Sequence, residues 1–256
     1  MKFRVLGCSG GQVPGQKLSC FLIDDSLLLD AGSVTSALSF GAQQKIDNIL
    51  ITHIHLDHVM SLGILADNLY GKRQTSINLW STTEIIDGLE KFFFNNYIWP
   101  DFTRLTGSTQ TVPVVQFTKL PEETPTQIGN LSVTAVRVNH VVPSLAFFIA
   151  NEGKTLLHIG DTGPTENVWA WAQKSPNLGA IVIEASFPNR LQEVADSSLH
   201  LTPETLGHEI EKLGDSDIPI LVTHLKPAFR KEIIADLQKL RNPRLRILED
   251  GDTLDF

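Results

Sequence analysis

The chain has 256 residues, of which 42% are hydrophobic and 20% are charged, as in an ordinary globular protein. Its formal charge of −8 at neutral pH argues against a nucleic-acid partner, because nucleic-acid surfaces are normally basic. No run of about 18 apolar residues is present, so no membrane span is expected. No N-terminal signal sequence is evident, which predicts a cytoplasmic protein. Two cysteines, Cys8 and Cys20, are too few for a disulfide framework and are expected to be free thiols.

The first part of the chain predicts short strands that end in polar loops. Residues 2–6 alternate as a strand and lead into a glycine-rich loop at 7–11, which can approach a ligand closely. Residues 19–24 and 26–30 predict paired strands joined by a turn at two aspartates. Asp30 closes the second of these strands.

The most informative stretch follows the next predicted strand. Residues 49–51 are apolar and β-branched, as in a buried strand, and residues 59–69 have the apolar spacing of a helix. Between them the chain reads His-Ile-His-Leu-Asp-His over residues 53–58. Packing does not explain three imidazoles and a carboxylate in six residues, because each needs a partner when buried. A polar surface loop is the weaker alternative.

The spacing of these side chains favours metal binding. Residues two apart on an extended segment point to the same side, so His53 and His55 can hold one ion as a pair. Asp57 and His58 come after the chain has begun to turn and are directed elsewhere, toward a second ion. Imidazole nitrogen and carboxylate oxygen suit zinc, and also manganese or iron.

The remaining chain predicts strands alternating with helices. Strands are expected at 77–80, 128–139, 146–151, 154–159, 179–185, 218–223 and 245–248, and helices at 82–94, 167–173, 203–213 and 231–240. Thr202 is the expected N-cap of the helix that begins with Pro203. The pattern predicts an α/β fold, a four-layer αββα sandwich of two mixed sheets flanked by helices, in one domain over 1–256.

A helical and aromatic segment is expected at about 64–120. Six aromatic side chains lie within residues 92–102. Such a group more often packs in the core or between subunits, although it could also stack a purine.

Three more polar residues end predicted strands: His140, Asp161 and His224. Each alone is more typical of a hydrogen-bonded core or surface residue. Glu184 also ends a strand, and His200 precedes a helix. Glu184 can simply form a structural salt bridge, which is the alternative to the role beside His200 described below.

Several strings resemble known families. Residues 53–58 resemble the H-x-H-x-D-H motif of the metallo-β-lactamase fold. The longer string 55–65, with 183–189, 200–203 and 223–227, is similar to class II cyclic-nucleotide phosphodiesterases along nearly the whole chain. The short motif implies the fold and the metals, whereas the other strings imply the substrate.

This resemblance implies a complete ligand set for two divalent ions, with zinc as the first choice. One ion is implied for His53, His55 and His140, the other for Asp57, His58 and His224, with Asp161 bridging them. Two such ions activate water and neutralise charge on a phosphate ester. Asp30 is expected to support the metal loop, or to act only as a turn or cap residue.

The resemblance also implies a reaction. Water attacks the phosphorus of 3′,5′-cyclic AMP, with cyclic GMP as a second candidate, and a nucleoside 5′-monophosphate results. His200 is the expected proton donor to the departing 3′ oxygen, and Glu184 orients it. We expect Asp57 to be a catalytic residue as well as a metal ligand. A homodimer is expected.

Two other functions remain open. One is a tRNA 3′-processing endonuclease of the ribonuclease Z type, or another phosphodiesterase of the same fold. The acidic charge and the lack of a glycine-rich basic insertion count against the endonuclease. The second is a catalytically silent metal-binding or nucleotide-sensing module, which is expected to lack a ligand or the proton donor.

Overall fold

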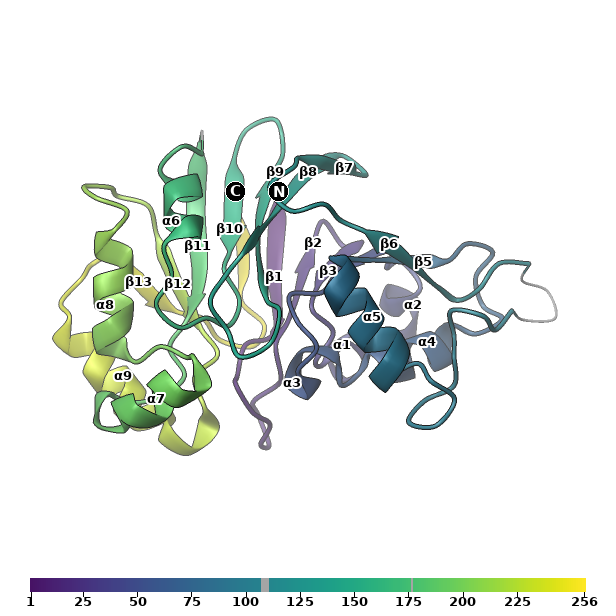
Figure 1. Cartoon of the computed structure of the whole chain (residues 1–256), viewed down its shortest axis with the longest axis horizontal. Coiled ribbons are helices and arrows are strands. Elements are labelled where there is room, and N and C mark those ends of the chain that lie inside the picture. The colour runs from purple at the N-terminus through teal and green to yellow at the C-terminus, as the bar shows by residue number, and fades with distance from the viewer. Residues whose placement is uncertain (107–110, 176) are drawn as a thin grey trace.

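The computed structural model describes residues 1–106, 111–175 and 177–256. These residues form two seven-stranded sheets that pack against each other (Figure 1). Helices α1–α5 accompany the first sheet, and helices α6–α9 cover the second. Both sheets contain parallel and antiparallel pairs. The predicted four-layer arrangement with two mixed sheets is therefore confirmed.

Within the described residues, the strand orders are β14-β1-β2-β3-β4-β5-β6 and β13-β12-β11-β10-β9-β8-β7. The strands are β1 (Lys2–Gly7), β2 (Cys20–Ile23), β3 (Leu27–Leu29), β4 (Asn48–Leu50), β5 (Ile77–Ser81), β6 (Val115–Lys119), β7 (Thr126–Ile128), β8 (Leu131–Arg137), β9 (Leu145–Ala150), β10 (Thr155–His158), β11 (Leu178–Glu184), β12 (Ile220–Thr223), β13 (Leu245–Ile247) and β14 (Thr253–Asp255). The α-helices are α1 (Val34–Ala37), α2 (Phe40–Gln43), α3 (Leu56–Val59), α4 (Leu62–Leu69), α5 (Thr83–Phe92), α6 (Asn167–Ala172), α7 (Gln192–Ser198), α8 (Pro203–Glu211) and α9 (Arg230–Lys239), with 3₁₀ turns η1 (Asn189–Leu191) and η2 (Pro227–Phe229).

The predicted hairpins are present. Strands β2 and β3 pair antiparallel, and their turn residues Asp24 and Asp25 have φ values of 46° and 59°. Positive φ at both central positions is the geometry of the two-residue hairpin turn that matches strand twist. Strands β9 and β10 also pair antiparallel, as predicted. Thr202 caps α8, with its hydroxyl accepting from the Thr205 amide.

The single helix predicted over 59–69 is wrong. The chain forms α3, breaks at Met60 and Ser61, and then forms α4. The Ala31 carbonyl oxygen accepts from both the amide (3.0 Å) and the hydroxyl (2.9 Å) of Ser61. Because the Ser61 amide bonds to Ala31, it cannot continue the hydrogen-bond ladder of α3. This contact fixes the helix break against the loop that follows β3.

Among the described residues, eight short elements were not predicted from the sequence: α1, α2, α7, β6, β7, β14, η1 and η2. Their apolar patterns are too short to distinguish from loops, because periodicity needs a longer window. Strand β14 pairs with β1 at the edge of the first sheet. The two termini therefore lie side by side (Figure 1), and the amino group of Met1 donates to the Phe256 carbonyl at 2.7 Å.

The aromatic segment after α5 divides between core and surface. Phe94 and Phe102 are buried in the main core. Trp99 packs on α4, where a β-carbon at Gly63 would lie 2.9 Å from its ring, and its indole donates to the Gly63 carbonyl at 3.0 Å. Tyr97 is 92% exposed. Core packing is therefore correct for part of the segment only.

Both cysteines are buried free thiols, as predicted. Burial raises the pKa of Cys8 and of Cys20 far above the ordinary value, which keeps them protonated and unreactive. Among the described helices, none has the length and apolarity needed to cross a bilayer.

The loop containing Gly32 allows a direct test of the packing around the metal motif. A β-carbon at Gly32 would overlap the backbone carbonyl oxygen of Asp57 and lie 2.7 Å from that of Ser19. Gly32→Ala should therefore lower the free energy of unfolding in urea by about 1–3 kcal/mol. Gly41→Ala is the control, because α2 leaves nothing within 4 Å of that position, and it should change stability little or raise it. Equal stability of Gly32→Ala and wild type would contradict this packing.

Candidate metal centre

The polar residues predicted from the two halves of the chain meet where strands β4, β8, β10 and β12 end. Two groups have ligand atoms that all lie within 4.8 Å of one another: His53, His55 and His140 in one, and Asp57, His58, Asp161 and His224 in the other. The structure thus brings together all seven predicted ligands. Both sheets contribute, so the site exists only when the sandwich is closed.

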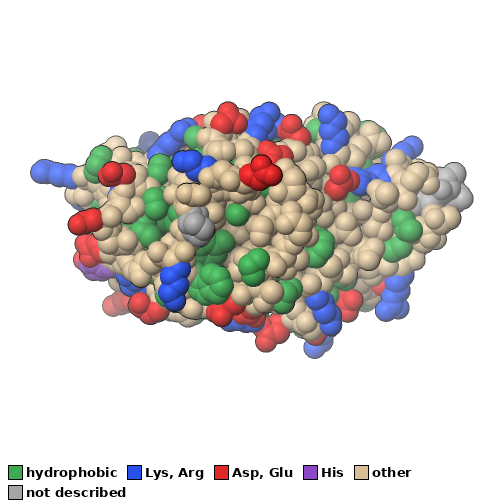
Figure 2. Space-filling view, turned by 90° about the horizontal axis from the view of Figure 1, so that it is seen from above, with side chains coloured by type: hydrophobic (Ala, Val, Ile, Leu, Met, Phe, Trp, Pro, Cys, Tyr) green, Lys and Arg blue, Asp and Glu red, His purple; other side chains and the backbone are tan. Residues whose placement is uncertain are grey.

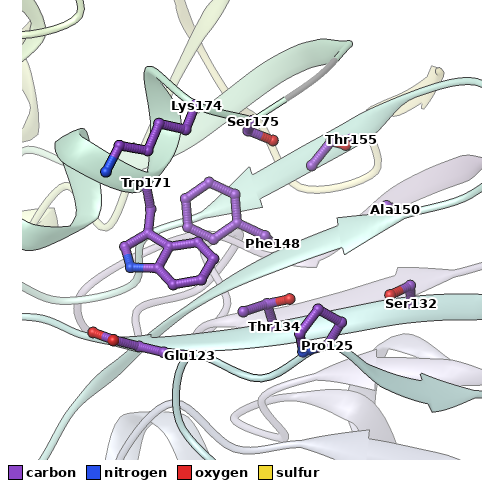
Figure 3. Close-up of a pocket in the computed structure, with 10 residues that line it drawn as sticks. All are labelled: Glu123, Pro125, Ser132, Thr134, Phe148, Ala150, Thr155, Trp171, Lys174 and Ser175. Atoms are coloured by element: carbon purple, nitrogen blue, oxygen red, sulfur yellow. The ribbon is translucent and has the colours of Figure 1, made fainter.

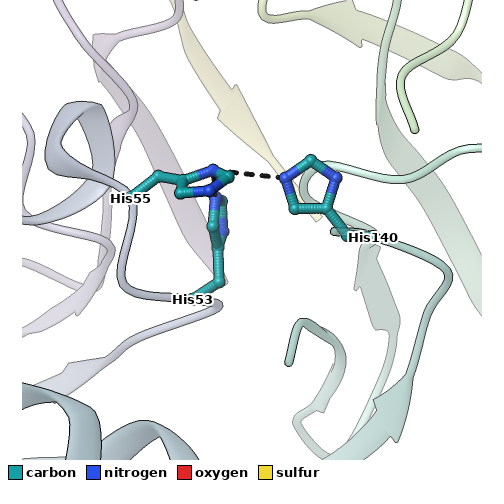
Figure 4. A group of neighbouring side chains, drawn as sticks. All are labelled: His53, His55 and His140. Carbon is teal, nitrogen blue, oxygen red and sulfur yellow. Dashed lines mark hydrogen bonds between the residues drawn. The ribbon is translucent and has the colours of Figure 1, made fainter. Parts of the chain in front are cut away.

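The first group consists of three convergent imidazoles (Figure 4). Nδ1 of His55 lies 3.0 Å from Nε2 of His53 and 3.2 Å from Nε2 of His140. Burial lowers the pKa of all three rings, and neighbouring histidines lower it further. These rings are therefore neutral, which is the form that binds a metal ion.

The backbone and a hydroxyl group orient two of these rings. Nδ1 of His140 lies 2.9 Å from the Leu199 carbonyl oxygen. A carbonyl can only accept, so Nδ1 carries the proton and Nε2 presents a lone pair to the cluster. Nδ1 of His53 lies 3.0 Å from the Thr52 hydroxyl, which leaves its Nε2 facing the same point.

In the second group, the two ring nitrogens of His58 show whether these residues suit a metal cation. Its Nδ1 lies 2.7 Å from Oδ2 of Asp30. Its Nε2 is buried and has no hydrogen-bond partner among the described residues, although Oδ2 of Asp161 is 3.4 Å away. A buried, unpartnered nitrogen beside a buried carboxylate matches what a divalent ion requires.

The buried carboxylates of this group favour positive charge beside them. Burial opposes the charged form of His58, but Asp161 and Asp30 outweigh it and raise the pKa of His58 well above its ordinary value. Burial likewise opposes ionisation of Asp161, yet His224 and His58 hold the pKa of that carboxyl well below its usual range. The carboxylate is therefore ionised and surrounded by imidazoles.

Asp161 lies between the two groups. Its Oδ2 is 3.3 Å from Nε2 of His224 and 3.8 Å from Nε2 of His53. His224 is also 3.1 Å from Oδ2 of Asp57. One buried carboxylate oxygen thus faces imidazoles of both groups, as a bridging ligand must.

The backbone is strained next to the second group. Asp30 and His224 have φ values of 57° and 62°, which non-glycine residues rarely adopt. A β-carbon at Gly10 would lie 2.6 Å from the carbonyl oxygen of His224 and 2.7 Å from its Nδ1. Gly10, in the glycine-rich loop at 7–11, therefore makes room for His224. The expectation that this loop approaches a ligand stays a prediction.

A buried His–Glu pair adjoins the cluster. Nδ1 of His200 lies 2.6 Å from Oε1 of Glu184, whose side chain is fully buried. The ring of His200 stacks at 5.6 Å on His224 and meets His140 edge-on at 5.0 Å. Burial opposes the charged form, but Glu184 raises the pKa of His200, which favours a protonated imidazole.

Comparison with known proteins decides the family. The model of the class-II cAMP phosphodiesterases matches residues 33–255. The chain belongs to this family. A probable 3′,5′-cyclic-nucleotide phosphodiesterase of Yersinia pestis is 28% identical over 98% of this chain and 88% of its own length.

Solved structures agree with the fold. The crystal structure of unliganded yeast PDE1 aligns with a TM-score of 0.82 at 20% identity, covering 100% of this chain and 99% of that one. The metallo-β-lactamase fold protein YhfI from Bacillus subtilis aligns with a TM-score of 0.77 at 21% identity, covering 99% and 98%. Both the family and the metallo-β-lactamase fold predicted from the sequence are confirmed.

Two hydroxyl groups in this class-II phosphodiesterase escaped sequence analysis. Thr52 donates to Asp30 at 2.9 Å and contacts the ring of His53. Ser186 donates to Glu184 and lies 2.9 Å from Nδ1 of His224. Their only signal in the sequence is position, one residue before His53 and two after Glu184, because serine and threonine are common in loops.

The remaining basic residues of interest lie outside the phosphodiesterase cluster. His158 is buried in β10 with its ring 5.1 Å from Phe21, and burial lowers its pKa to about 4. His208 is exposed on α8. Arg137 pairs with Glu122 and, at 2.8 Å, with Glu84. These three side chains therefore pack in the core, face solvent or form ion pairs.

A cavity of about 650 Å³ lies elsewhere on the phosphodiesterase, between α6 and the outer face of the second sheet (Figure 3). Phe148 and Trp171 line it. It also involves Thr155, at the start of β10, whereas Asp161 follows the far end of that strand. The cavity is thus at the opposite end of the sheet from the metal cluster and shares none of its residues.

Asp30 supports the cluster without reaching its centre, which can be tested. Its carboxylate accepts from the Thr52 amide at 2.8 Å and from His58 at 2.7 Å. Asp30→Asn replaces one acceptor oxygen with a donor, so divalent-ion affinity should fall about 10–100-fold. Competition with a chromophoric chelator measures this. Asp25→Asn, at an exposed turn, should bind as tightly as wild type, and equal affinity in the two variants would contradict the role of Asp30.

Proposed function

We propose that this class-II phosphodiesterase hydrolyses 3′,5′-cyclic nucleotides to nucleoside 5′-monophosphates at a centre of two divalent ions. The observation that carries the proposal is the convergence of seven imidazole and carboxylate ligands beside a buried His–Glu pair. Cyclic AMP is the first substrate, in keeping with the family, and cyclic GMP is the second.

The proposed ligand assignment follows the two groups in the structure. One ion would be held by His53, His55 and His140, the other by Asp57, His58 and His224, with Asp161 between them. Bound there, the two ions would lower the pKa of water toward neutrality and neutralise charge on the phosphoryl oxygens. Zinc suits this donor set best, and manganese or iron share the same ligands.

Asp57 is the most open member of its group. Its side chain is 27% exposed, whereas those of Asp161 and His58 are 4% and 1% exposed. Burial opposes ionisation, but the adjacent imidazoles of His224 and His58 lower the pKa of Asp57. We assign the ionised carboxylate a second role, in which it accepts a hydrogen bond from the attacking water and orients it.

His200 is the proposed proton donor. Its Nδ1 is engaged by Glu184, so Nε2 is the nitrogen that can give a proton to the departing 3′ oxygen. One ring nitrogen of His200 lies within 4.8 Å of a ring nitrogen of His140 and of a carboxylate oxygen of Asp161. Glu184 fixes the ring and stabilises its charge, as an orienting carboxylate does.

The domain organisation and the oligomeric state of the protein are also part of the proposal. The whole of 1–256 acts as one domain, since ligands from both sheets form one cluster. Tyr97 and Ile98, which are 92% and 61% exposed, offer apolar surface for the homodimer that the sequence predicts. A cytoplasmic location stays a prediction.

Replacement of the proton donor separates catalysis from metal binding. His200→Ala should lower kcat for cyclic AMP by about 10²–10⁴-fold, while metal content per chain stays at the wild-type value. His208→Ala, on the exposed face of α8, is the control and should leave both unchanged. Loss of metal from His200→Ala would show that His200 is a ligand or a structural residue.

A tRNA 3′-processing endonuclease is the second candidate function, because the sequence resemblance gives it the same ligands and the same His200–Glu184 pair. The charge of −8 disfavours it. One face of the molecule shows acidic side chains interspersed with basic ones (Figure 2). Metal-loaded enzyme should hydrolyse cyclic AMP and leave a precursor tRNA intact. Cleavage of the precursor without action on either cyclic nucleotide would reverse this order.

A further inference from the structure

Ser186 occupies a central position behind the candidate metal centre. It follows β11 and is fully buried. Its hydroxyl donates to Oε2 of Glu184, and the oxygen lies 2.9 Å from Nδ1 of His224 and 3.3 Å from Nδ1 of His200. One hydroxyl therefore contacts a ligand of the metal centre and both members of the adjoining His–Glu pair.

The protons of this group have one consistent arrangement. The carboxylate of Glu184 only accepts, and its oxygens already receive Nδ1 of His200 and the Thr162 amide at 2.6 Å and 2.9 Å. Ser186 has a single hydroxyl proton, and the hydroxyl uses it to donate a hydrogen bond to the carboxylate of Glu184. The hydroxyl oxygen must then accept from Nδ1 of His224. That ring consequently presents Nε2, without a proton, toward Asp57.

The same arrangement occurs on the other side of the centre. Thr52 donates its hydroxyl proton to Asp30 at 2.9 Å and faces Nδ1 of His53 at 3.0 Å. A buried carboxylate and a hydroxyl thus fix a ligand ring in each half of the site. Only the Ser186 arrangement also includes the proposed proton donor, His200.

We propose that Ser186 is a positioning residue that sets the tautomer of His224 and couples the ion held by this ligand to the His200–Glu184 pair. This inference rests on the metal centre of the proposed function. It does not depend on which phosphate ester is the substrate. Ser186 does not contact the reacting atoms, so it acts through His224 and Glu184. Loss of its hydroxyl should affect the ion at His224 more than the ion at His53.

The test compares threonine and valine at position 186, which have the same shape and differ in the hydroxyl. Apo-protein is titrated with Zn²⁺ in the absence of substrate, with a chromophoric chelator as competitor. In Ser186→Val, one of the two binding events should weaken by about 10–100-fold while the other is unchanged. Ser186→Thr should bind both ions with affinities close to those of wild type, so it should bind the affected ion more tightly than Ser186→Val does.

Ser33→Ala is the matched control, because Ser33 is also a buried serine but its hydroxyl donates only to the Leu18 carbonyl, at 2.7 Å. It should leave both binding events unchanged. Equal zinc affinity in Ser186→Thr and Ser186→Val, or equal weakening of both events, would overturn the proposal. Wild type that binds two ions but hydrolyses no cyclic nucleotide would refute the proposed substrate while leaving the role of Ser186 standing.

Discussion

The buried carboxylate of Asp161, faced by imidazoles from both groups of ligands, is the constraint on which the site depends. An ionised group in a dry interior is costly unless positive charge neutralises it. The ring nitrogens that face it are directed inward because acceptors hold the opposite nitrogens. The arrangement therefore has the polarity of a cation site before any ion binds.

This constraint explains why the fold tolerates unusual backbone around the site. Asp30 and His224 adopt left-handed conformations, and Gly10 and Gly32 leave no room for a β-carbon. Such features cost free energy and persist only where the surrounding structure determines them. Gly10 lets loops of the two sheets approach each other at His224, and Gly32 lets loops of the first sheet pack closely at Asp57.

The sequence predicted much of this site because its ligands have distinctive chemistry. Imidazoles and carboxylates at the ends of predicted strands marked His140, Asp161 and His224 as candidates, and the family resemblance implied their role as ligands. The hydroxyls of Thr52 and Ser186 did not, since their importance comes from contacts between distant segments. The break between α3 and α4 was missed for the same reason, because the Ala31 carbonyl, far away in the sequence, captures the Ser61 amide.

Crystals grown with zinc and measured on both sides of the zinc absorption edge would test the central claim most directly. The account predicts two anomalous peaks about 3.5–4 Å apart, one beside His53 and His140 and the other beside His58 and His224, with Asp161 between them. A single peak, or peaks away from these side chains, would contradict it.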